Sequence, residues 1–397
     1  MRVVYVHPFT QQLSGPDESL LALLAPLLSS GVEAHLVVPR LGPLADRYRA
    51  LGVILHVQPL TILHRGMLAA ETTLFGPRLL ARAARLTALI RRIRADIVHT
   101  NMEVVLEGGL AARLLGLPHV LHYRGNSLDS PRRLFDILTF LWTSLADRVF
   151  CISNATADVF RRRGRGKKIE VLYNPIAVPS FRSAIRSDEV RASLGAKRGQ
   201  PLVITMGRIH PRKDIETFVR TCARIGAAIP EARFAIVGTA ESPSELAYHS
   251  QVMNLAVRTG LNDGRLTFAG TRRDVPAVMR AADVFVLASR HEGFGRVVAE
   301  AMAAGTAVVA TREGALPELI EEPRYGLGAD PANDADFSSQ IVTLLQDDAR
   351  RNAMGRAAAE HAEGFDAGRL AGRVRRCYEQ LLADRRPQQN TNAGESR

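Results

Sequence analysis

Two glutamates stand eight positions apart in HEGFGRVVAEAMAAGTAVVA, residues 291–310. Glu292 lies in a loop that follows a strand-like run, and Glu300 lies inside the helical pattern after it. Carboxylates accept hydrogen bonds from the neighbouring hydroxyls of a sugar. The pattern therefore predicts that each glutamate holds hydroxyl groups of a ligand, Glu300 from a place near the mouth of the helix.

The glycines between the two glutamates suit an anion. Gly293 and Gly295 let the backbone approach a ligand closely, and Phe294 stands between them. The first N–H groups of the following helix have no partner within that helix, so they form a ready anion site. A phosphate is expected there.

Arg208 and Lys213 supply the matching cations. They occur in VITMGRIHPRKDIETF, which runs from a strand into a helix. A guanidinium binds phosphate oxygens in pairs, while an ammonium acts as a point charge. Two exposed loop cations can also be merely solvated, and charge alone leaves both interpretations open. Together with the glutamates and the glycine loop, the cations predict a nucleoside diphosphate sugar as ligand.

The elements that position these residues follow a βαβ rhythm, typical of a parallel sheet covered on both faces. Two series of short apolar runs alternate with helical patterns. The sequence predicts an α/β protein with two doubly wound, Rossmann-like domains. Because ligands of such sheets bind beyond the carboxyl ends of the strands, two facing sheets would form an interdomain cleft. The runs are RVVYVHP, AHLVVP, DIVHT, HVLHY, RVFCIS and IEVLYNP, then PLVITMGR, RFAIVGT, RLTFAGT, DVFVLAS and TAVVAT.

The predicted boundaries follow changes in composition. We expect a first domain at 1–178, a polar linker with a short helix at 179–200, and a second domain at 201–362. Residues 363–386 form an amphipathic helix, and 387–397 are polar and predicted to be disordered.

Composition and charge limit the function classes. The chain has 397 residues, lacks any apolar run long enough to span a membrane, and begins with a strand-like segment, so we expect a cytosolic protein. Its three cysteines are widely spaced and predict neither disulfides nor a zinc site. Lys and Arg outnumber Asp and Glu by 22 to 13 in residues 1–178 and by 30 to 27 in the remainder. The basic first domain indicates an anionic partner.

These motifs together resemble the retaining glycosyltransferases of group 1, family four, with the GT-B fold. The resemblance covers nearly the whole chain and rests on GRIHPRKD, on the Glu-x7-Glu spacing and on GALPELI near residue 314. It implies that Arg208 and Lys213 bind the donor diphosphate. It also implies that Glu292 lies against the transferred sugar, and that Glu300 holds the ribose hydroxyls. The residues between them, Gly293, Phe294 and Gly295, complete the donor loop.

The resemblance extends to the first domain. HVLHYRGN is similar to a family strand that ends in a histidine over the donor sugar, which assigns a catalytic role to His122. Arg124 and Asn126 follow on the acceptor side. His99, from the preceding strand, is the rival histidine, and a structural role is favoured for it. Gly15 corresponds to a glycine of the family's donor-binding loop.

The sequence departs from the family pattern at three places. Pro16 stands where a second glycine is usual and cannot donate an N–H, which puts the backbone contacts of that loop in doubt. Asp214 replaces a usual glycine, and Thr306 replaces a common proline. The resemblance also implies that the last helix crosses back to the first domain.

The implied reaction is transfer of a sugar with retention at the anomeric carbon. The leaving diphosphate, stabilised by Arg208, Lys213 and helix amides, helps to deprotonate the acceptor hydroxyl. We expect neither a metal nor a cofactor, because no Asp-x-Asp motif is present and the two cations take the place of a metal.

The acceptor side is predicted from charge. Arginines at 78, 82, 85 and 92 fall near one helical face, and RRRGRGKK, residues 161–168, adds a cationic loop. We hypothesise transient contact with an anionic membrane, where a lipid-linked or cell-envelope acceptor lies. A solvated helix face is the competing interpretation. Nucleic acid is not expected, because no aromatic-studded basic groove accompanies the charge.

Two other function classes remain open at this point. A sugar-nucleotide epimerase shares the fold and the donor but needs no acceptor, and the Glu-x7-Glu spacing disfavours it. A non-catalytic nucleotide-sugar binding subunit would keep the donor residues without turnover. His122 and Glu292 disfavour that alternative. The family resemblance implies a setting in the synthesis of a polysaccharide, lipopolysaccharide or glycolipid.

Overall fold

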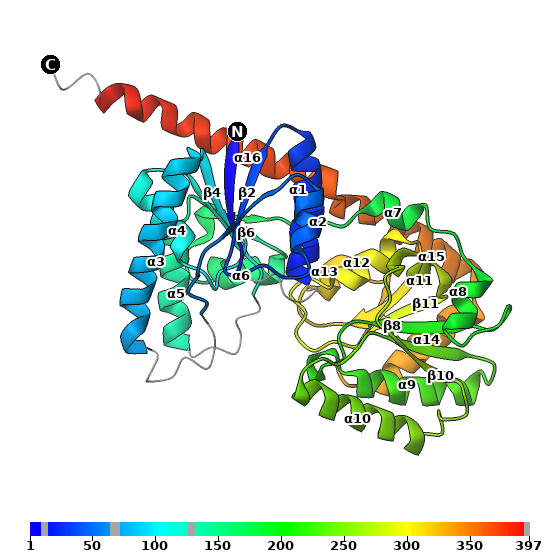
Figure 1. Ribbon diagram of the computed structural model, residues 1–397. Helices are drawn as coiled ribbons and strands as arrows, with labels where there is room; N and C mark the ends of the chain where they lie inside the picture. Colours follow the sequence, from blue (N-terminus) through cyan, green and yellow to red (C-terminus); the bar gives the residue numbers. More distant parts are fainter. Residues whose placement is uncertain (9–14, 64–71, 126–131, 393–397) are drawn as a thin grey trace. The chain divides into compact units, whose positions relative to one another are not determined.

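The computed structural model describes residues 1–8, 15–63, 72–125 and 132–392. The chain divides into two compact units. Unit 1 comprises Met1–Pro175 together with Ala367–Arg397, and unit 2 comprises Ile176–Asp366. Each unit is built on one parallel sheet (Figure 1).

Unit 1 holds a seven-stranded sheet in the order β3-β2-β1-β4-β5-β6-β7. Every strand pair within it is parallel, as the βαβ rhythm predicts. The order reverses between β1 and β4, which makes this the switch point of the sheet. The strands are β1 (Arg2–Val6), β2 (Glu33–Val38), β3 (Ile54–Val57), β4 (Ile97–Thr100), β5 (His119–Tyr123), β6 (Arg148–Cys151) and β7 (Ile169–Val171).

Side chains of the unit 1 strands alternate between two cores, as the pleat of a strand requires. Val3 and Tyr5 of β1 pack in the core with α1 and α16. Val4 and Val6 pack in the core with α3 and α4. The helices are α1 (Gly15–Ser29), α2 (Ala45–Ala50), α3 (Thr72–Ile93), α4 (Glu107–Leu115), α5 (Arg132–Leu145), α6 (Asn154–Arg161), η2 (Gly166–Lys168) and α16 (Ala367–Asn392).

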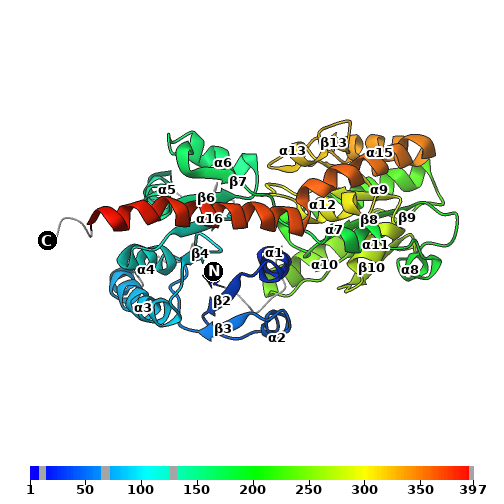
Figure 2. The same cartoon turned by 90° about the horizontal axis from the view of Figure 1, so that it is seen from above.

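Helix α16 belongs to unit 1, although unit 2 precedes it in the sequence. It packs beside α1, as both views show (Figures 1 and 2). The predicted apolar stripe lies in the unit 1 core and consists of Leu370, Val374, Cys377, Tyr378 and Leu381. The helix continues to Asn392, so the predicted disordered tail from 387 is helical over its first residues, and 393–397 lie outside the described residues.

Unit 2 holds a six-stranded parallel sheet in the order β10-β9-β8-β11-β12-β13, with its switch point between β8 and β11. Its strands are β8 (Leu202–Met206), β9 (Arg233–Val237), β10 (Leu266–Gly270), β11 (Val284–Leu287), β12 (Ala307–Thr311) and β13 (Leu327–Ala329). Its helices are α7 (Val178–Arg182), α8 (Asp188–Ser193), η3 (Pro211–Lys213), α9 (Ile215–Ala228), α10 (Pro243–Arg258), α11 (Val275–Ala281), α12 (Arg296–Ala303), α13 (Leu316–Ile320), α14 (Asp334–Gln346), α15 (Asp348–His361) and η4 (Ala362–Phe365).

The segment 179–200, predicted to be a linker, is instead a folded part of unit 2. Phe181 and Leu194 are buried, and α7 and α8 pack on α11. The buried Arg191 binds the carboxylate of Asp283 at 3.3 Å and the carbonyl of Ala281. The polar composition of the segment hid these anchors.

All eleven predicted strands are present, and each sheet has one further strand that the sequence analysis did not identify. Strand β3 is a half-exposed edge strand that contains His56. Strand β13 has only three residues, one of them Gly328. Strand β13 is too short to show an apolar run, whereas the apolar residues of β3, Ile54, Leu55 and Val57, were not identified as a strand.

Candidate functional site

The predicted donor residues of unit 2 lie at the switch point of its sheet. Arg208 follows β8, and the loop that carries Glu292 follows the neighbouring strand β11. The chain leaves β8 through Gly207, which has φ 147°. A Cβ on Gly238, after β9, would lie 2.0 Å from the carbonyl oxygen of Gly207. Only glycine fits at residue 238 because the two loop backbones touch.

Lys213 and Glu292 are brought into direct contact. The ammonium Nζ of Lys213 donates to Oε2 of Glu292 at 2.9 Å. The two side chains are 24% and 21% exposed, so the pair is partly accessible. Two residues that were assigned to one ligand from separate motifs, 79 positions apart, are therefore neighbours.

A second set of contacts locks the same two loops together. The backbone N–H of Arg290 donates to the carbonyl of Arg212 at 2.8 Å. The guanidinium of Arg290 donates to Oδ2 of Asp214 at 3.0 Å. The hydrogen bond to Asp214 raises the pKa of Arg290 above its ordinary value. Sequence reasoning did not identify this latch.

Asp214 itself explains one departure from the family pattern. Its φ of 46° lies in the left-handed region, where glycine is the usual choice. Aspartate tolerates this conformation and caps helices. Its side chain accepts from the N–H of Thr217 at the start of α9 and also binds Arg290. The available signal was an N-cap residue directly before the apolar pattern IETF.

The GALPELI segment hydrogen-bonds to the backbone of the Glu292 loop. The N–H of Ala315 donates to the carbonyl of Glu292 at 3.0 Å. Gly314 has φ 62°, and a Cβ there would lie 2.3 Å from the same oxygen. Gly314 therefore permits the close approach of the two backbones, and this contact fixes the position of the Glu292 backbone.

Glu300 forms an ion pair within its own helix. Nε of Arg296, four residues earlier, donates to Oε1 of Glu300 at 2.7 Å. Glu300 is buried and lies in the second turn of α12. The i,i+4 spacing was the signal for this pair, and Arg296 is a partner that sequence reasoning missed.

The glycine loop ends at the N-terminus of α12. Gly295 is the N-cap residue with φ 88°, and a Cβ there would lie 2.5 Å from a methyl group of Leu316. Phe294 is buried and packs edge-on against Phe365 at 5.5 Å between ring centroids. Its ring anchors the loop in the core. Of the predicted donor loop, Gly293 and the backbone N–H groups are therefore the parts that we expect to face a ligand.

Arg208 takes a different partner from Lys213. Its Nε lies 3.3 Å from Oε1 of Glu245, and its side chain is 56% exposed. Glu245 is buried and accepts from the N–H groups of Glu241 and Ser242 in the capping box of α10. Burial raises the pKa of Glu245, but these hydrogen bonds and the charge of Arg208 outweigh it and hold the pKa below the ordinary value. Glu245 stays ionised and orients Arg208.

In unit 1, Arg124 lies at the end of β5 and is buried. Nη2 of Arg124 donates to Oδ1 of Asn101 at 3.0 Å, and Nη1 donates to Asn174. The N–H of Arg124 donates to Oε2 of Glu103 at 3.0 Å. Asn126, its predicted companion on the acceptor side, lies outside the described residues.

His122 is fully buried beneath this network. Its Nδ1 lies 3.3 Å from Nη2 of Arg124, and its ring stacks on His99 at 5.7 Å between centroids. Nε2 has no hydrogen-bond partner among the described residues. Burial first, then Arg124 and His99, lower the pKa of His122 well below its ordinary value. The ring is neutral, and its burial does not favour direct contact with a substrate.

His99 connects β4 to the last helix. Its Nδ1 lies 2.5 Å from the hydroxyl of Tyr378, and that hydroxyl donates to Tyr5 at 3.2 Å. Burial, with Arg124 and His119, lowers the pKa of His99 well below the ordinary value. These contacts agree with the structural role expected for His99.

The switch point of unit 1 carries a further pair that the sequence did not reveal. Nε2 of His7 lies 2.6 Å from Oδ1 of Asp17, and its Nδ1 lies 3.0 Å from Nδ2 of Asn101. Asp17 is in the first turn of α1, two residues after Gly15. Gly15 is exposed at the start of that helix.

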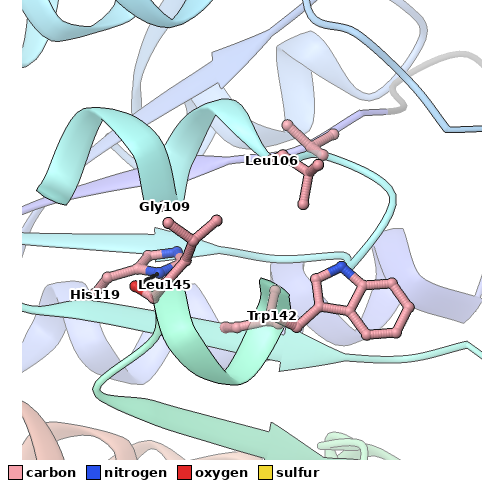
Figure 3. A pocket seen from close by; sticks show the side chains of 7 residues that line it. Leu106, Gly109, His119, Trp142 and Leu145 are labelled. Carbon is pink, nitrogen blue, oxygen red and sulfur yellow. Dashed lines mark hydrogen bonds between the residues drawn. The ribbon is translucent and has the colours of Figure 1, made fainter. Parts of the chain in front are cut away.

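A small cavity lies between α4, α5 and β5 in unit 1 (Figure 3). Its walls are mostly apolar, and Gly109 allows the close approach of His119 and Leu145. Both ring nitrogens of His119 have partners, the hydroxyl of Thr100 and the carbonyl of Leu145. The cavity therefore offers no unsatisfied polar group to a ligand.

The described ranges contain neither a metal-binding cluster nor a membrane-spanning helix. In residues 1–8, 15–63, 72–125 and 132–392, no three His, Cys, Asp or Glu side chains are grouped so that they could hold a metal ion. Across the same part of the chain, no helix is both long and apolar enough to cross a membrane.

Comparison with protein families matches both halves of the chain. The glycosyl transferases group 1 family matches residues 200–347, and glycosyltransferase family 4 matches residues 14–178. The donor motifs lie in the first match, and His122 and Arg124 lie in the second.

Individual relatives and a solved structure agree with these matches. The chain is 27% identical over 311 residues to an Escherichia coli UDP-Gal:α-D-GlcNAc-diphosphoundecaprenol α-1,3-galactosyltransferase, covering 75% of this chain and 78% of that protein. It is 30% identical over 306 residues to Arabidopsis thaliana sulfoquinovosyl transferase SQD2, covering 73% of this chain and 58% of that protein. Anabaena HepE, solved in complex with UDP, superposes with a TM-score of 0.82 at 21% identity, covering 96% of this chain and 100% of that chain.

The predicted fold class, two Rossmann-like domains of GT-B type, is confirmed by the two sheets and by this superposition. Because the two family matches together span most of the sequence, the chain belongs to the group 1 glycosyltransferases, with a family 4 domain in its first half.

Proposed function

We propose that this glycosyltransferase moves a sugar from a nucleoside diphosphate donor to a hydroxyl acceptor, with retention at the anomeric carbon and without a metal. The observation that carries the proposal is the contact of Lys213 with Glu292 at the switch point of the unit 2 sheet. A cation for the diphosphate and a carboxylate for the sugar stand side by side there.

A donor diphosphate that binds here must compete with the Lys213–Glu292 ion pair. A diphosphate that reaches Lys213 replaces the carboxylate as its partner, because two phosphates carry more charge than one carboxylate. Glu292 is then released to accept hydrogen bonds from the transferred sugar. Arg208, held by Glu245, supplies the second cation, and the N–H groups from Gly293 to Gly295 at the start of α12 supply the uncharged donors.

In this proposal Glu300 accepts from the ribose hydroxyls at the start of α12. Its pairing with Arg296 fixes the position of the carboxylate at the start of the helix. Arg208 and Lys213 also stabilise the leaving diphosphate, which takes the proton of the acceptor hydroxyl. No protein nucleophile is required for retention by this route.

The roles of the first half are assigned more indirectly. His122 was predicted to be catalytic, over the donor sugar. Because it is buried, the role proposed for it here is to position Arg124, whose guanidinium lies against its ring. Arg124, Asn126 and Gly15 remain assigned to the acceptor and donor loops by family resemblance.

The names of relatives support the donor class and a lipid-linked acceptor. The Escherichia coli relative is named for UDP-galactose and a diphosphoundecaprenol acceptor, and HepE was solved with UDP-glucose. We therefore propose a UDP-sugar donor and an acceptor on a lipid carrier or glycolipid, reached from the cytoplasmic side of an anionic membrane. Nucleic acid has no part in this function.

The experiment that tests the donor site is a thermal shift of the purified protein with UDP, GDP, ADP, CMP and their sugar conjugates. A ligand that binds the folded state raises the melting temperature by mass action. We expect UDP to stabilise the protein and the Arg208→Ala/Lys213→Ala variant to lose the shift, because the affinity falls about a hundredfold or more without both cations.

The chain supplies a matched control. Lys197 and Arg198 precede β8 at the opposite end of the same strand and are exposed. The Lys197→Ala/Arg198→Ala variant removes the same two charges and should keep the full shift. A shift that survives in the Arg208→Ala/Lys213→Ala variant would remove the diphosphate assignment.

Product analysis separates the alternative functions once a donor is known. An epimerase converts the donor sugar without any acceptor, and a non-catalytic subunit binds the donor without turnover. Nuclear magnetic resonance of the product linkage decides retention. An inverted anomeric centre would overturn the proposed mechanism while leaving the donor site intact.

A further inference from the structure

Helix α5 of unit 1 has an exposed apolar face. Leu134, Ile137 and Phe140 are 49%, 57% and 52% exposed, and they recur at spacings of three residues along the helix. The opposite face is buried through Phe135 and Trp142. A helix that is apolar on both faces has a second surface to cover.

The cationic segment 161–168, predicted to be a loop, packs against this helix. Nε of Arg163 donates to Asp136 of α5 at 2.6 Å. The guanidinium carbon of Arg165 lies 4.8 Å above the ring of Phe140. Nζ of Lys168 donates to the carbonyl of Ala146, just past the end of α5. The exposed apolar side chains and the cations therefore form one surface, which we call the α5 face.

The charge of the α5 face is strongly positive. Two carboxylates, Asp136 and Asp158, lie on it, and each already pairs with an arginine. Among the described side chains of residues 133–145 and 154–168, seven cations stand against these two carboxylates, namely Arg133, Arg161, Arg162, Arg163, Arg165, Lys167 and Lys168.

A second exposed apolar stripe in unit 2 lacks this charge. Leu246, Met253 and Val257 of α10 are 51%, 47% and 56% exposed. The only Lys or Arg within that helix is Arg258. Both α5 and α10 therefore expose apolar side chains, but the exposed apolar side chains of α5 have many cations beside them and those of α10 do not.

We propose that the α5 face docks on the surface of an anionic phospholipid bilayer. Leu134, Ile137 and Phe140 enter the boundary between headgroups and acyl chains, while the cations bind the lipid phosphates. A cation stacked on an aromatic ring suits this boundary, because the ring is buried in lipid as the charge stays at the headgroups.

The proposal locates the membrane contact on a different element from the arginine row of α3. Arg78, Arg85 and Arg92 of that row are exposed, but Arg82 turns inward and donates to the carbonyl of Leu60 at 2.8 Å. The α5 face deepens the proposed membrane contact. Its test reads lipid binding and not turnover, so its failure and the failure of the transferase assignment are distinguishable.

Insertion can be read directly from a fluorescent probe. The three native cysteines are buried, so a single added thiol on the surface is labelled selectively. The Ile137→Cys variant, labelled with an environment-sensitive dye, is mixed with vesicles of phosphatidylcholine alone or of phosphatidylcholine with phosphatidylglycerol. We expect a blue shift of the dye emission with the anionic vesicles only, and no shift for the matched Leu246→Cys variant on α10.

Sedimentation with the same vesicles tests the energetics in the unlabelled protein. Ile137→Ser/Phe140→Ser should lower the bound fraction about tenfold, and high salt should lower it for the unchanged protein. Leu246→Ser/Val257→Ser should bind as the unchanged protein does. The proposal is overturned if the unchanged protein ignores anionic vesicles, if both double variants bind equally, or if the dye at residue 137 stays in water. If the dye at residue 137 stays in water while the unchanged protein still sediments with anionic vesicles, the contact is assigned to α3.

Discussion

The carboxyl edges of the two sheets are organised in opposite ways. In unit 1, Arg124, Asn101 and His122 form a buried cluster whose polar atoms bind one another. In unit 2, Lys213 and Glu292 form an ion pair that is about one-fifth exposed. The same position in two related sheets is closed in one unit and accessible in the other.

This difference separates two kinds of work. A buried hydrogen-bonded network fixes geometry, and removing one member leaves its partners without compensation. A partly exposed ion pair contributes little to stability and exchanges its partner readily. Unit 2 therefore presents groups that a ligand can recruit, whereas unit 1 presents a rigid support.

The largest effect that would sharpen this contrast is expected at Arg124. Arg124→Ala should lower the free energy of unfolding of unit 1 by about 3–5 kcal/mol, because Asn101 and Asn174 lose their buried partner. Urea unfolding followed by the fluorescence of Trp142, the single tryptophan, reports this unit. Arg124→Lys keeps the charge but not the paired donors, and should recover only part of the loss. A cost below about 1 kcal/mol would show that the cluster is not a support.

Next in size is an acid sensitivity of unit 1. Burial lowers the pKa of His119 from 6.5 to about 4, against the weaker opposite effects of Leu145 and Asp147. The unfolded state binds the extra proton between these values, so stability is full above pH 6.5 and is lost as the pH falls toward 4. The loss from this one residue is of order 3 kcal/mol. The free energy of unfolding, measured by Trp142 fluorescence at a series of pH values across this range, should depend less steeply on pH for His119→Gln. An unchanged slope of free energy against pH would contradict the assignment.

A smaller effect is expected where the backbone is tight in unit 2. Gly314→Ala adds a Cβ that would lie 2.3 Å from the carbonyl of Glu292, at a φ that disfavours alanine. We expect a loss of about 1–3 kcal/mol and weaker stabilisation by UDP, because the Glu292 loop must shift. Hydrogen exchange of β12 amides reports the stability of this unit. Gly260→Ala, also at positive φ but with open space around its Cβ, separates backbone strain from the clash.

The smallest stability effect should come from Lys213→Ala. Loss of the partly exposed pair should change the free energy of unfolding by less than about 1 kcal/mol, while the thermal shift with UDP should largely disappear. Hydrogen exchange and thermal shift on the same sample measure both. A large loss of stability would make the pair a structural brace and would erase the contrast between the two units.

Periodicity was enough to predict most of the fold. Eleven strands, the two parallel sheets and the apolar stripe of α16 follow from apolar spacing alone. The failures occurred where tertiary contacts override composition. The polar segment 179–200 is folded because Phe181 and Arg191 find buried partners that no local pattern shows.

Motif spacing predicted one ligand for Lys213 and Glu292, and the structure places the two side chains in contact because they follow adjacent strands. It did not reveal the Asp214 to Arg290 latch, because an ion pair across two loops leaves no periodic trace. Nor did it reveal that His122 is fully buried, because a residue near a strand end can face either the ligand side or the core.

The return of α16 to unit 1 has a consequence for the nascent chain. Tyr378 reaches His99 across 279 positions and Tyr5 across 373, so part of the unit 1 core arrives last during synthesis. Unit 2 is continuous in sequence and emerges from the ribosome before α16 does. Unit 1 therefore waits, with the α16 side of its core uncovered, until the second unit is complete. Chaperone demand during translation should be concentrated on that uncovered surface.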